Sequence, residues 1–592
     1  MEFKKFLVVF TISLFGVNSS IVGSVVMEKQ VDKKRFQLDE GTYYCNPSLP
    51  CWPTQDEWGY LNKKVKGNLI QSKLPQESCK SSSYKDACKM HNPFFLESIP
   101  GGTQITGMLN AWDATISPYA VAAENAQDVA AAVNFARKHK LKVAIKGTGH
   151  DYFGRSNAPD SLLIWTHKMR DIKIDDKFVC QGCNQNEAVP AVTFGAGTRW
   201  LELYNVVATE HKRYVQGGGC TSVGAAGGFP QGGGYGSYSK RFGTGAANIV
   251  EIEVITADGK IRIANKHNNS DLFWSLRGGG GGTFGVVSKM TMKTHDTPTE
   301  SYLISGDIKI EDAEKFKELI EQFIHFFREK LNNEHFGEKV TFKKDSLAFR
   351  IVSINLTKRQ VDSVWKPFLE WARKEKFEVD VNISFLGKGM DLWNRNALVK
   401  VKKDFLEEDN KGHFWWKGDL EDISYFYGTY QGKYVPSSLI SKEIAKNTAQ
   451  TFYDAVQHHS FSIHIGKGLS GAHPYARRTH RETSLHPAVL DTVGLFVAGA
   501  SIKDLNRTIK DDTQTLTTLR NNVDLINKTM NILTKAIPHA GSYANEADYF
   551  QKNWQQEFWG DNYPKLLRIK KKYDPNNVFS CHHCVGSEFL EK

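Results

Sequence analysis

Beyond its N-terminus the chain has no apolar run long enough to cross a membrane, which takes about 20 consecutive residues. Charge of one sign is not concentrated either, because 76 Lys and Arg stand against 65 Asp and Glu, and the net charge of +11 is spread over all 592 residues. Short basic runs such as 570–572 lack interleaved aromatic residues, whereas a nucleic-acid surface needs a concentrated basic face. We therefore expect neither a membrane nor a nucleic-acid partner.

Several catalytic motifs are also missing. The sequence has no P-loop, and no G-x-S-x-G stands in the strand–turn–helix setting that a serine hydrolase requires. Residues 466–471 fit G-x-G-x-x-G, but they have no acidic partner and no clear βαβ setting. Internal repeats and low-complexity linkers are absent as well. These absences disfavour phosphate-loop enzymes, serine hydrolases, Rossmann dehydrogenases and repeat proteins.

The N-terminus has the pattern of a secretory signal. Lys4 and Lys5 precede the apolar run Phe6–Val17, and small residues follow it. We expect a signal peptide over 1–24, with a buried N-terminal helix as the alternative. Five N-x-S/T sequons follow, at Asn268, Asn355, Asn382, Asn506 and Asn527. Together these features predict a secreted glycoprotein.

The nine cysteines are an odd number, so at least one stays outside a disulfide in a monomer, the state that we expect. Eight of them form four pairs that are close in sequence: Cys45 with Cys51, Cys79 with Cys88, Cys180 with Cys183, and Cys581 with Cys584. Cys220 stands alone. The two C-x-x-C pairs also match halves of zinc sites, but in an oxidising compartment we predict four disulfides and no metal.

The length predicts two or three structural units. Residues 25–110 look irregular. Helical spacing is found over 127–139, 200–211, 312–330 and 358–376, and strand-like patterns are found over 141–145, 191–194, 249–256, 377–385 and 461–465. From about residue 300 glycine thins out, and charged amphipathic helices alternate with strands. That texture predicts an α+β domain with helices over a sheet.

Three glycine clusters follow residue 140 and carry most of the functional signal. His150 lies in Lys146-Gly-Thr-Gly-His-Asp-Tyr152, Cys220 lies in a block that runs from 217 to 236, and a third cluster spans 277–285. Each cluster adjoins a predicted strand, and bare backbone lets main-chain N–H groups approach a long anionic ligand closely. Imidazole and thiol are nucleophiles, so His150 and Cys220 predict two covalent tethers to an electrophilic ring. A turn histidine and a structural thiol are the alternatives.

These motifs resemble the FAD-binding domain of vanillyl-alcohol-oxidase-type flavoproteins. The closest branch is the berberine-bridge-enzyme-like oxidases, particularly the secreted fungal forms. The quoted segments are Lys146–Tyr152, Gly219–Gly224, Gly232–Gly236 and Leu276–Gly285, with Tyr543–Tyr549, Phe558–Tyr563 and Lys572–Phe579 in the C-terminal module and Cys51-Trp-Pro53 near the N-terminus. The resemblance implies an α+β fold: a PCMH-type FAD-binding domain of two α+β subdomains, and a substrate domain with an antiparallel sheet covered by helices.

The resemblance also implies domain boundaries. After the signal peptide it gives a cysteine-containing extension over 25–110, the FAD-binding domain over 111–298 and the substrate domain over 299–540. A C-terminal module over 541–592 is expected to return to the FAD domain.

The cofactor implied is FAD, attached through its 8α carbon to His150 and through C6 to Cys220. The other cofactor-binding residues implied are Lys146, Gly147, Thr148, Gly149, Asp151, Ser156, Thr221, Val223, Gly224, Gly227, Gly228, Gly233, Tyr235, Gly236, Val250, Asn545 and Asn562. One departure concerns Phe229-Pro230, where the family often has a histidine, and the spacing from Cys220 to Gly232 is one residue longer.

Catalysis needs a base that takes a substrate O–H or N–H proton while the adjacent C–H gives hydride to the flavin. The resemblance places Tyr152 and Tyr235 at the substrate cavity and Tyr543 near the flavin. Glu546 occupies the position of a base-like tyrosine in carbohydrate-oxidising relatives. His464 is an independent candidate, because alternation puts Phe461, Ile463 and Ile465 on one strand face and Ser462 with His464 on the other. The alternative is a histidine under solvated helices or at the surface.

The function expected is a secreted oxidase that passes electrons from an alcohol, saccharide or phenolic substrate to O2 and releases H2O2. Val223 matches a family position where valine accompanies oxygen reactivity. A dehydrogenase with another acceptor and an inactive binding protein on the same scaffold are the alternatives. Several aromatic residues either stack on substrate or belong to the core: Trp393, Trp415, Trp416, Tyr425, Tyr427 and Tyr430.

Overall fold

The computed structural model describes residues 44–75, 77, 90–388, 396, 406–408, 410–416, 426–503 and 513–589. The signal segment, the pair Cys79 and Cys88, the sequon at Asn506, and the aromatic residues Trp393 and Tyr425 lie outside the described residues. Among the helices described, none combines the length and the apolar character that crossing a membrane requires.

A four-stranded sheet begins the cofactor half of the molecule. Its order is β1 (Leu69–Gln71), β4 (Tyr119–Ala122), β6 (Ser161–Trp165) and β5 (Lys142–Lys146), with β4, β6 and β5 parallel and β1 antiparallel to β4. Helix α4 (Ala126–Lys138) is capped by the Asn125 side chain and buries Val129, Val133 and neighbouring alanines. Strand β5 ends at Lys146 and thereby delivers the 146–152 loop to the end of the sheet.

A second, antiparallel sheet completes this half. Its order is β11 (Ile261–Asn265), β10 (Ile249–Ile255), β12 (Val286–Asp296), β8 (Val189–Gly195) and β7 (Ile172–Phe178), and β9 (Arg213–Val215) also pairs with β12. The C-terminal helix α16 (Tyr563–Tyr573) packs on α8 (Ser270–Leu276) beside this sheet. Trp559 Nε1 donates to Gly278 O at 2.9 Å, so the C-terminal segment contacts the third glycine cluster.

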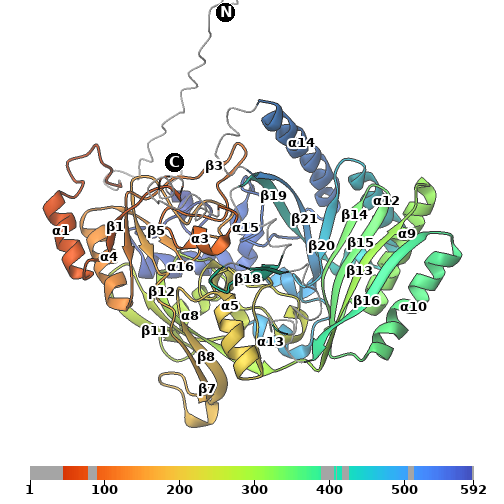
Figure 1. Ribbon diagram of the computed structural model, residues 1–592, viewed down its shortest axis with the longest axis horizontal. Helices are drawn as coiled ribbons and strands as arrows, with labels where there is room; N and C mark the ends of the chain where they lie inside the picture. The colour runs from red at the N-terminus through yellow and green to blue at the C-terminus, as the bar shows by residue number, and fades with distance from the viewer. Residues whose placement is uncertain are drawn as a thin grey trace, which may run out of the picture.

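A nine-stranded sheet fills the other half (Figure 1). Its order is β16 (Glu378–Lys388), β13 (Glu300–Lys309), β15 (Ser346–Ile354), β14 (Phe336–Lys343), β20 (Phe461–His464), β21 (Thr492–Lys503), β19 (Phe426–Pro436), β2 (Gly107–Met108) and β3 (Trp112–Asp113). All neighbours are antiparallel except β19 and β2. Residues 107–113 thus lie at the edge of this sheet, beside strands that come more than 300 residues later.

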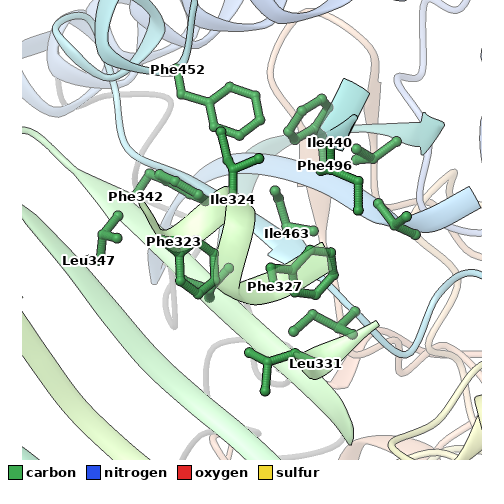
Figure 2. Packing of buried hydrophobic residues seen from close by; sticks show 14 of the residues in the cluster. Phe323, Ile324, Phe327, Leu331, Phe342, Leu347, Ile440, Phe452, Ile463 and Phe496 are labelled. Carbon is green, nitrogen blue, oxygen red and sulfur yellow. The ribbon is translucent and has the colours of Figure 1, made fainter. Parts of the chain in front are cut away.

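Four long helices accompany this sheet: α9 (Ala313–Phe326), α10 (Lys358–Lys374), α12 (Ala445–Val456) and α14 (Thr513–Lys535). Figure 2 shows part of this core, where Phe323 of α9 and Phe327 of the following π-helical segment lie in one cluster with Phe342, Phe452 and Phe496. Such aromatic and aliphatic burial is the main favourable term in the stability of the domain. The predicted α+β substrate domain with a helix-covered antiparallel sheet is confirmed.

The predicted helices over 127–139, 312–330 and 358–376 are present with small shifts in their ends, and 200–211 forms α5 (Trp200–Tyr204) followed by a π-helical segment. The prediction that 25–110 is irregular is wrong for α1 (Gln55–Lys64). Thr54 and Glu57 form a reciprocal capping box that starts this helix, and Trp58 and Leu61 are its buried face.

Three of the predicted disulfides are present: Cys45–Cys51, Cys180–Cys183 and Cys581–Cys584. Both C-x-x-C pairs are among these bonds. Cys220 takes part in none of these three bonds.

Candidate functional site

His150 and Cys220 meet at one hydroxyl group. His150 Nε2 lies 2.9 Å from Ser222 Oγ, and Cys220 Sγ lies 3.5 Å from the same oxygen. Ser222 itself is fully buried. The two predicted tether residues come from loops 70 residues apart in sequence, so the fold has brought both nucleophiles to one place.

The His150 ring is neutral in this setting. Desolvation lowers the pKa of His150 to about 3, so at neutral pH the ring keeps a lone pair on one nitrogen. The loop that carries the ring is fastened to the Cys220 loop, because Gly224 N–H donates to Thr148 Oγ1 at 2.9 Å. Gly149 has a φ of +85°, a conformation that favours glycine, and a Cβ there would lie 3.2 Å from Gly102 O.

The glycines around this pair differ in what surrounds them. A Cβ built on Gly219 or Gly228 would meet no heavy atom within 4 Å, and one on Gly227 would meet only Gly224 O at 3.9 Å. A Cβ on Gly217 or Gly236, by contrast, would collide with neighbouring protein atoms. Bare backbone beside open space, next to two nucleophiles, fits a ligand that main-chain groups approach closely, as FAD requires.

Two predicted cofactor-binding residues, Lys146 and Asp151, use their charged groups in contacts within the protein. The buried Lys146 ammonium donates to the carbonyl oxygens of Ile99, Pro100 and Gly102 at 2.6, 3.0 and 2.6 Å. Asp151 accepts from the N–H groups of Phe153 and Arg155 at 3.0 and 2.8 Å and pairs with the Arg155 guanidinium. Both side chains therefore shape the loop that presents His150.

A hairpin covers the Cys220 loop. Strands β17 (Leu406–Glu408) and β18 (Phe414–Trp416) pair antiparallel, and Thr221 Oγ1 donates to Phe414 O at 3.0 Å. Buried Trp415 contacts Phe94 of α3 (Pro93–Glu97), and Cys220 packs against this small cluster. The predicted aromatic residue Trp415 is thus core packing above the tether.

Tyr543 and Asn545 lie on the C-terminal turn beside the second glycine block. Tyr543 Oη accepts from Gly234 N–H at 3.2 Å and from Asn545 Nδ2 at 3.0 Å. Asn545 Nδ2 also donates to Gly228 O at 2.9 Å, so this amide links the catalytic candidate to the open glycine backbone. Burial, and secondarily the charge of Glu546, raise the pKa of Tyr543, which keeps its hydroxyl protonated.

Tyr235 joins the same group. Its ring packs edge-on against Tyr543 with centroids 4.8 Å apart, and its hydroxyl lies 3.3 Å from that of Tyr434 on β19. Burial raises the pKa of Tyr235, and Tyr434 and Glu546 add to the shift. Three tyrosines thus form one buried, protonated set.

Two residues that the sequence did not single out as catalytic, Lys467 and Tyr430, contact the predicted catalytic residues Glu546 and Tyr152. Glu546 forms an ion pair with Lys467, and Tyr430 Oη donates to Glu546 Oε2 at 2.9 Å. The Tyr430 ring stacks on Tyr152 with centroids 5.1 Å apart.

His464 lies on the strand face predicted from alternation, since Phe461 and Ile463 are buried and His464 is half-buried. Desolvation lowers the pKa of His464, and Lys467 and then Lys339 lower it further. The ring is therefore neutral.

The remaining predicted residues have different surroundings. Gly233 has a φ of +142° and packs against Tyr543, Val223 N–H lies 3.4 Å from Cys220 O, and Asn562 Nδ2 donates to Leu485 O at 2.8 Å. Ser156 is buried, Gly147 makes only ordinary van der Waals contacts, and Val250 lies half-buried on β10 at a shift of its register with β12.

Two family models match parts of this chain. The family model described as FAD binding domain matches residues 117–265, and the model described as berberine and berberine like matches 542–586. The FAD-linked oxidoreductase ZEB1 of Gibberella zeae is 30% identical over 568 residues, which cover 92% of each chain.

Two solved structures share the fold. The VAO-type flavoprotein MtVAO615 from Myceliophthora thermophila C1 is 26% identical, with a TM-score of 0.74 over 92% of this chain and 97% of that one. The glucooligosaccharide oxidase from Acremonium strictum, which has a 6-S-cysteinyl, 8α-N1-histidyl FAD, is 18% identical, with a TM-score of 0.64 over 89% and 98% of the two chains. The chain therefore belongs to the VAO-type, berberine-like family of FAD-linked oxidoreductases and is an FAD-dependent oxidoreductase.

Proposed function

We propose that the protein is a secreted oxidase with FAD attached to both His150 and Cys220. It would oxidise a hydroxyl-bearing small molecule (an alcohol, saccharide or phenol) and pass the electrons to O2. The observation that carries the proposal is the approach of His150 and Cys220 to one hydroxyl, that of Ser222. The Acremonium oxidase, which has a histidyl and a cysteinyl attachment, supports the same arrangement.

FAD, when bound, supplies a hydride acceptor whose electrons can pass on to O2. The residues of the chain hold the cofactor and shape the loops around it. His150, whose ring is neutral, and Cys220 would retain the cofactor. The hydrogen bond from Gly224 N–H to Thr148 Oγ1 keeps their two loops together. Asn545 fixes the backbone of Gly228, and the cluster around Trp415 packs against Cys220.

Purified secreted protein should be yellow, and its colour should survive denaturation. A panel of sugars, oligosaccharides, primary alcohols and phenols should identify substrates that consume O2 and release H2O2 in equal amounts. Val223, at the position associated with oxygen reactivity in the family, favours this result over dye reduction. Turnover with a quinone or dye but not with O2 would instead establish a dehydrogenase, and a colourless protein would overturn the proposal.

The proposal of secretion rests on the signal-like N-terminus and the sequons. Asn382 is exposed on β16, an edge strand of the nine-stranded sheet. Protein recovered from culture medium should begin near residue 25 and lose mass on treatment with an N-glycosidase. Retention in the cell with an intact N-terminus would contradict secretion.

A further inference from the structure

A row of polar side chains crosses one face of the nine-stranded sheet. In the strand register, His464 of β20 lies opposite Lys339 of β14, and Lys339 lies opposite Arg350 of β15. Ser305 of β13 continues the row, because it lies opposite both Arg350 and Asn382 of β16. We call these five residues the polar row: Asn382, Ser305, Arg350, Lys339 and His464. The row crosses five adjacent strands, which lie about 4.8 Å apart.

The polar row lies on the face of the sheet that turns away from the long helices. Its neighbours along the strands, among them Ile304, Val340 and Ile463, belong to the core between the sheet and those helices. Side chains alternate between the two faces of a strand, so the polar row lies on the other face. Figure 1 shows the cofactor half on that side of the sheet.

The cofactor half packs on the neighbouring row of the same face. Leu303 and Val352 lie opposite each other, two residues from Ser305 and Arg350, and both are buried in one cluster with residues of the cofactor half. A Cβ on Gly337, opposite Val352, would collide with backbone of the cofactor half. The polar row therefore begins where this contact ends, and its residues are half-buried or exposed.

The polar row carries positive charge and contains no carboxylate. Lys339 and Arg350 lie directly opposite each other, and like charges in that position destabilise a sheet. Within the described residues, Lys339 has no carboxylate at ion-pair distance. Desolvation lowers the pKa of His464, so its ring adds no charge at neutral pH. An anionic group bound beside Lys339 and Arg350 would offset their repulsion.

Carboxylates next to the polar row have other partners. Glu338 is adjacent to the row in sequence, but its side chain accepts a hydrogen bond from Ser237 Oγ. In the next row, farther from the cofactor half, Asp307 lies opposite Asp380 and forms an ion pair with Lys309 at 3.4 Å. The charge on this face thus changes from positive to negative with distance from the cofactor half.

One end of the polar row is connected to the candidate tether site. Lys467 N–H donates to the carbonyl oxygen of the last residue in the row at 3.1 Å, and Lys467 forms an ion pair with Glu546. Tyr430 donates to Glu546 and stacks on Tyr152, two residues beyond His150. A substrate with one end at the flavin can therefore extend along the row toward Lys339.

We infer that the polar row binds an anionic group of a saccharide substrate, and that Lys339 and Arg350 determine the preference for it. The inference rests on the proposed function and selects acidic saccharides among its substrates. Arginine and lysine bind carboxylate and sulfate oxygens through charge-assisted hydrogen bonds. Two strand spacings, about 10 Å, separate β20 from β15, which suits an oligosaccharide rather than a small alcohol.

The test compares three disaccharides that differ only at C6 of the non-reducing sugar: cellobiose, its C6 carboxylate (cellobiouronate) and its C6 sulfate. With flavin-loaded wild type, KM for an anionic form should be about 10- to 100-fold lower than KM for cellobiose, as expected for hydrogen bonds between charged groups. A preference for the carboxylate alone would identify uronate-type substrates, and a preference for the sulfate alone would identify sulfated saccharides. Equal KM values for all three would overturn the inference.

Variants of Lys339 test the assignment to the row. Lys339→Met should reduce the preference for the anionic form by about tenfold, Lys339→Glu should reduce it further, and Lys339→Arg should retain it. The matched control is Lys343→Met, because Lys343 is an exposed lysine at the far end of the same strand. This control should keep the preference of the wild type. An equal loss in both Met variants would mean that surface charge in general attracts the substrate, and would overturn the role of the row.

Binding without turnover separates this inference from the proposed function. Calorimetric titration of protein whose flavin has been reduced beforehand, under anaerobic conditions, measures Kd for cellobiouronate and for cellobiose. Added salt should weaken the binding of cellobiouronate to wild type more than to Lys339→Glu. Tighter binding of cellobiouronate through Lys339 without oxidation of any saccharide would support the row and contradict the proposed function. Oxidation of cellobiose with equal Kd values for both sugars would support the proposed function and overturn the inference.

Discussion

His150 Nε2 and Cys220 Sγ both lie close to a single hydroxyl group, at 2.9 and 3.5 Å from Ser222 Oγ. The two residues come from different loops, and the hydrogen bond between Thr148 and Gly224 keeps those loops in register. Two independent attachments to one cofactor require this kind of proximity. The pair therefore makes a prediction about how far each attachment survives without the other.

We expect Cys220→Ala and His150→Ala each to keep covalent flavin, because the two bonds are expected at different ring carbons. Each single variant should turn over more slowly and have a lower flavin potential, since each attachment withdraws electron density. The double variant should lose its colour on denaturation. Flavin fluorescence after denaturing electrophoresis measures this outcome directly.

Mass spectrometry of the wild-type peptide around Cys220 supplies the control. A flavin adduct should be present, and Cys220→Ala should expose no new thiol among the other eight cysteines. A disulfide at Cys220 in place of an adduct would leave a protein attached through His150 alone.

Ser222→Ala should lower the fraction of flavin that is covalently bound, because it removes the hydroxyl that orients both nucleophiles. The variant should fold, since the serine is small and its loss creates little cavity. Absorbance of acid-precipitated protein compares covalent with total flavin. Ser353→Ala, an equally buried serine on β15, is the control. A covalent fraction equal to wild type would mean that Ser222 has no part in attachment.

The sequence predicted the parts of the site that are local. Glycine-dense loops beside strands indicated bare backbone around His150 and Cys220, and alternation in β20 placed His464 on the correct face. Ser222 stood inside a quoted motif, but the direction of its side chain depends on the 146–152 loop. The ion pair between Lys467 and Glu546 joins residues 79 apart in sequence, and packing of the C-terminal module on β19 brings them together.

The sequence pattern around Lys467 pointed to a different kind of site. Gly466-Lys-Gly fits a weak nucleotide-binding pattern. In the structure, however, Gly466 is needed because a Cβ there would lie 2.7 Å from Gly236 O. The capping box at Thr54 was readable from sequence, and the cysteine and proline content around it obscured the helix. Local rules therefore reached the loops and helices, and they failed where two distant segments share one contact.

Gly432→Ala should move the 543–546 turn away from strand β19, on which it packs. The new methyl would collide with Glu546 O, so the 543–546 turn has to move away from β19. We expect a loss of about 1–3 kcal/mol in the free energy of unfolding, typical of overpacking, and a fall in flavin reduction rate with flavin still attached. Thermal unfolding and stopped-flow reduction measure the two effects. Gly59→Ala on α1, where a Cβ meets nothing within 4 Å, is the control: it should leave flavin reduction unchanged and should not destabilise the protein, because alanine favours a helix by about 1 kcal/mol over glycine.

Acid should destabilise the protein between about pH 6.5 and pH 4, because several buried histidines resist protonation in the folded state. Burial is the first cause that lowers the pKa of His480, His582 and His295 to about 4 each. In this window the unfolded chain binds protons that the folded chain does not, so the stability is fully present above pH 6.5 and is lost as the pH falls toward 4. Each unit of pKa difference corresponds to about 1.4 kcal/mol.

His480 is 2% exposed and its Nε2 lies 3.3 Å from His486 O, so His480→Gln should flatten the pH dependence of Tm while keeping a side chain that can hydrogen-bond. His458→Gln, at an exposed histidine, should not flatten it. If Tm of the His480 variant falls with acid as steeply as that of wild type, the histidine burial described here does not govern the acid limit of stability.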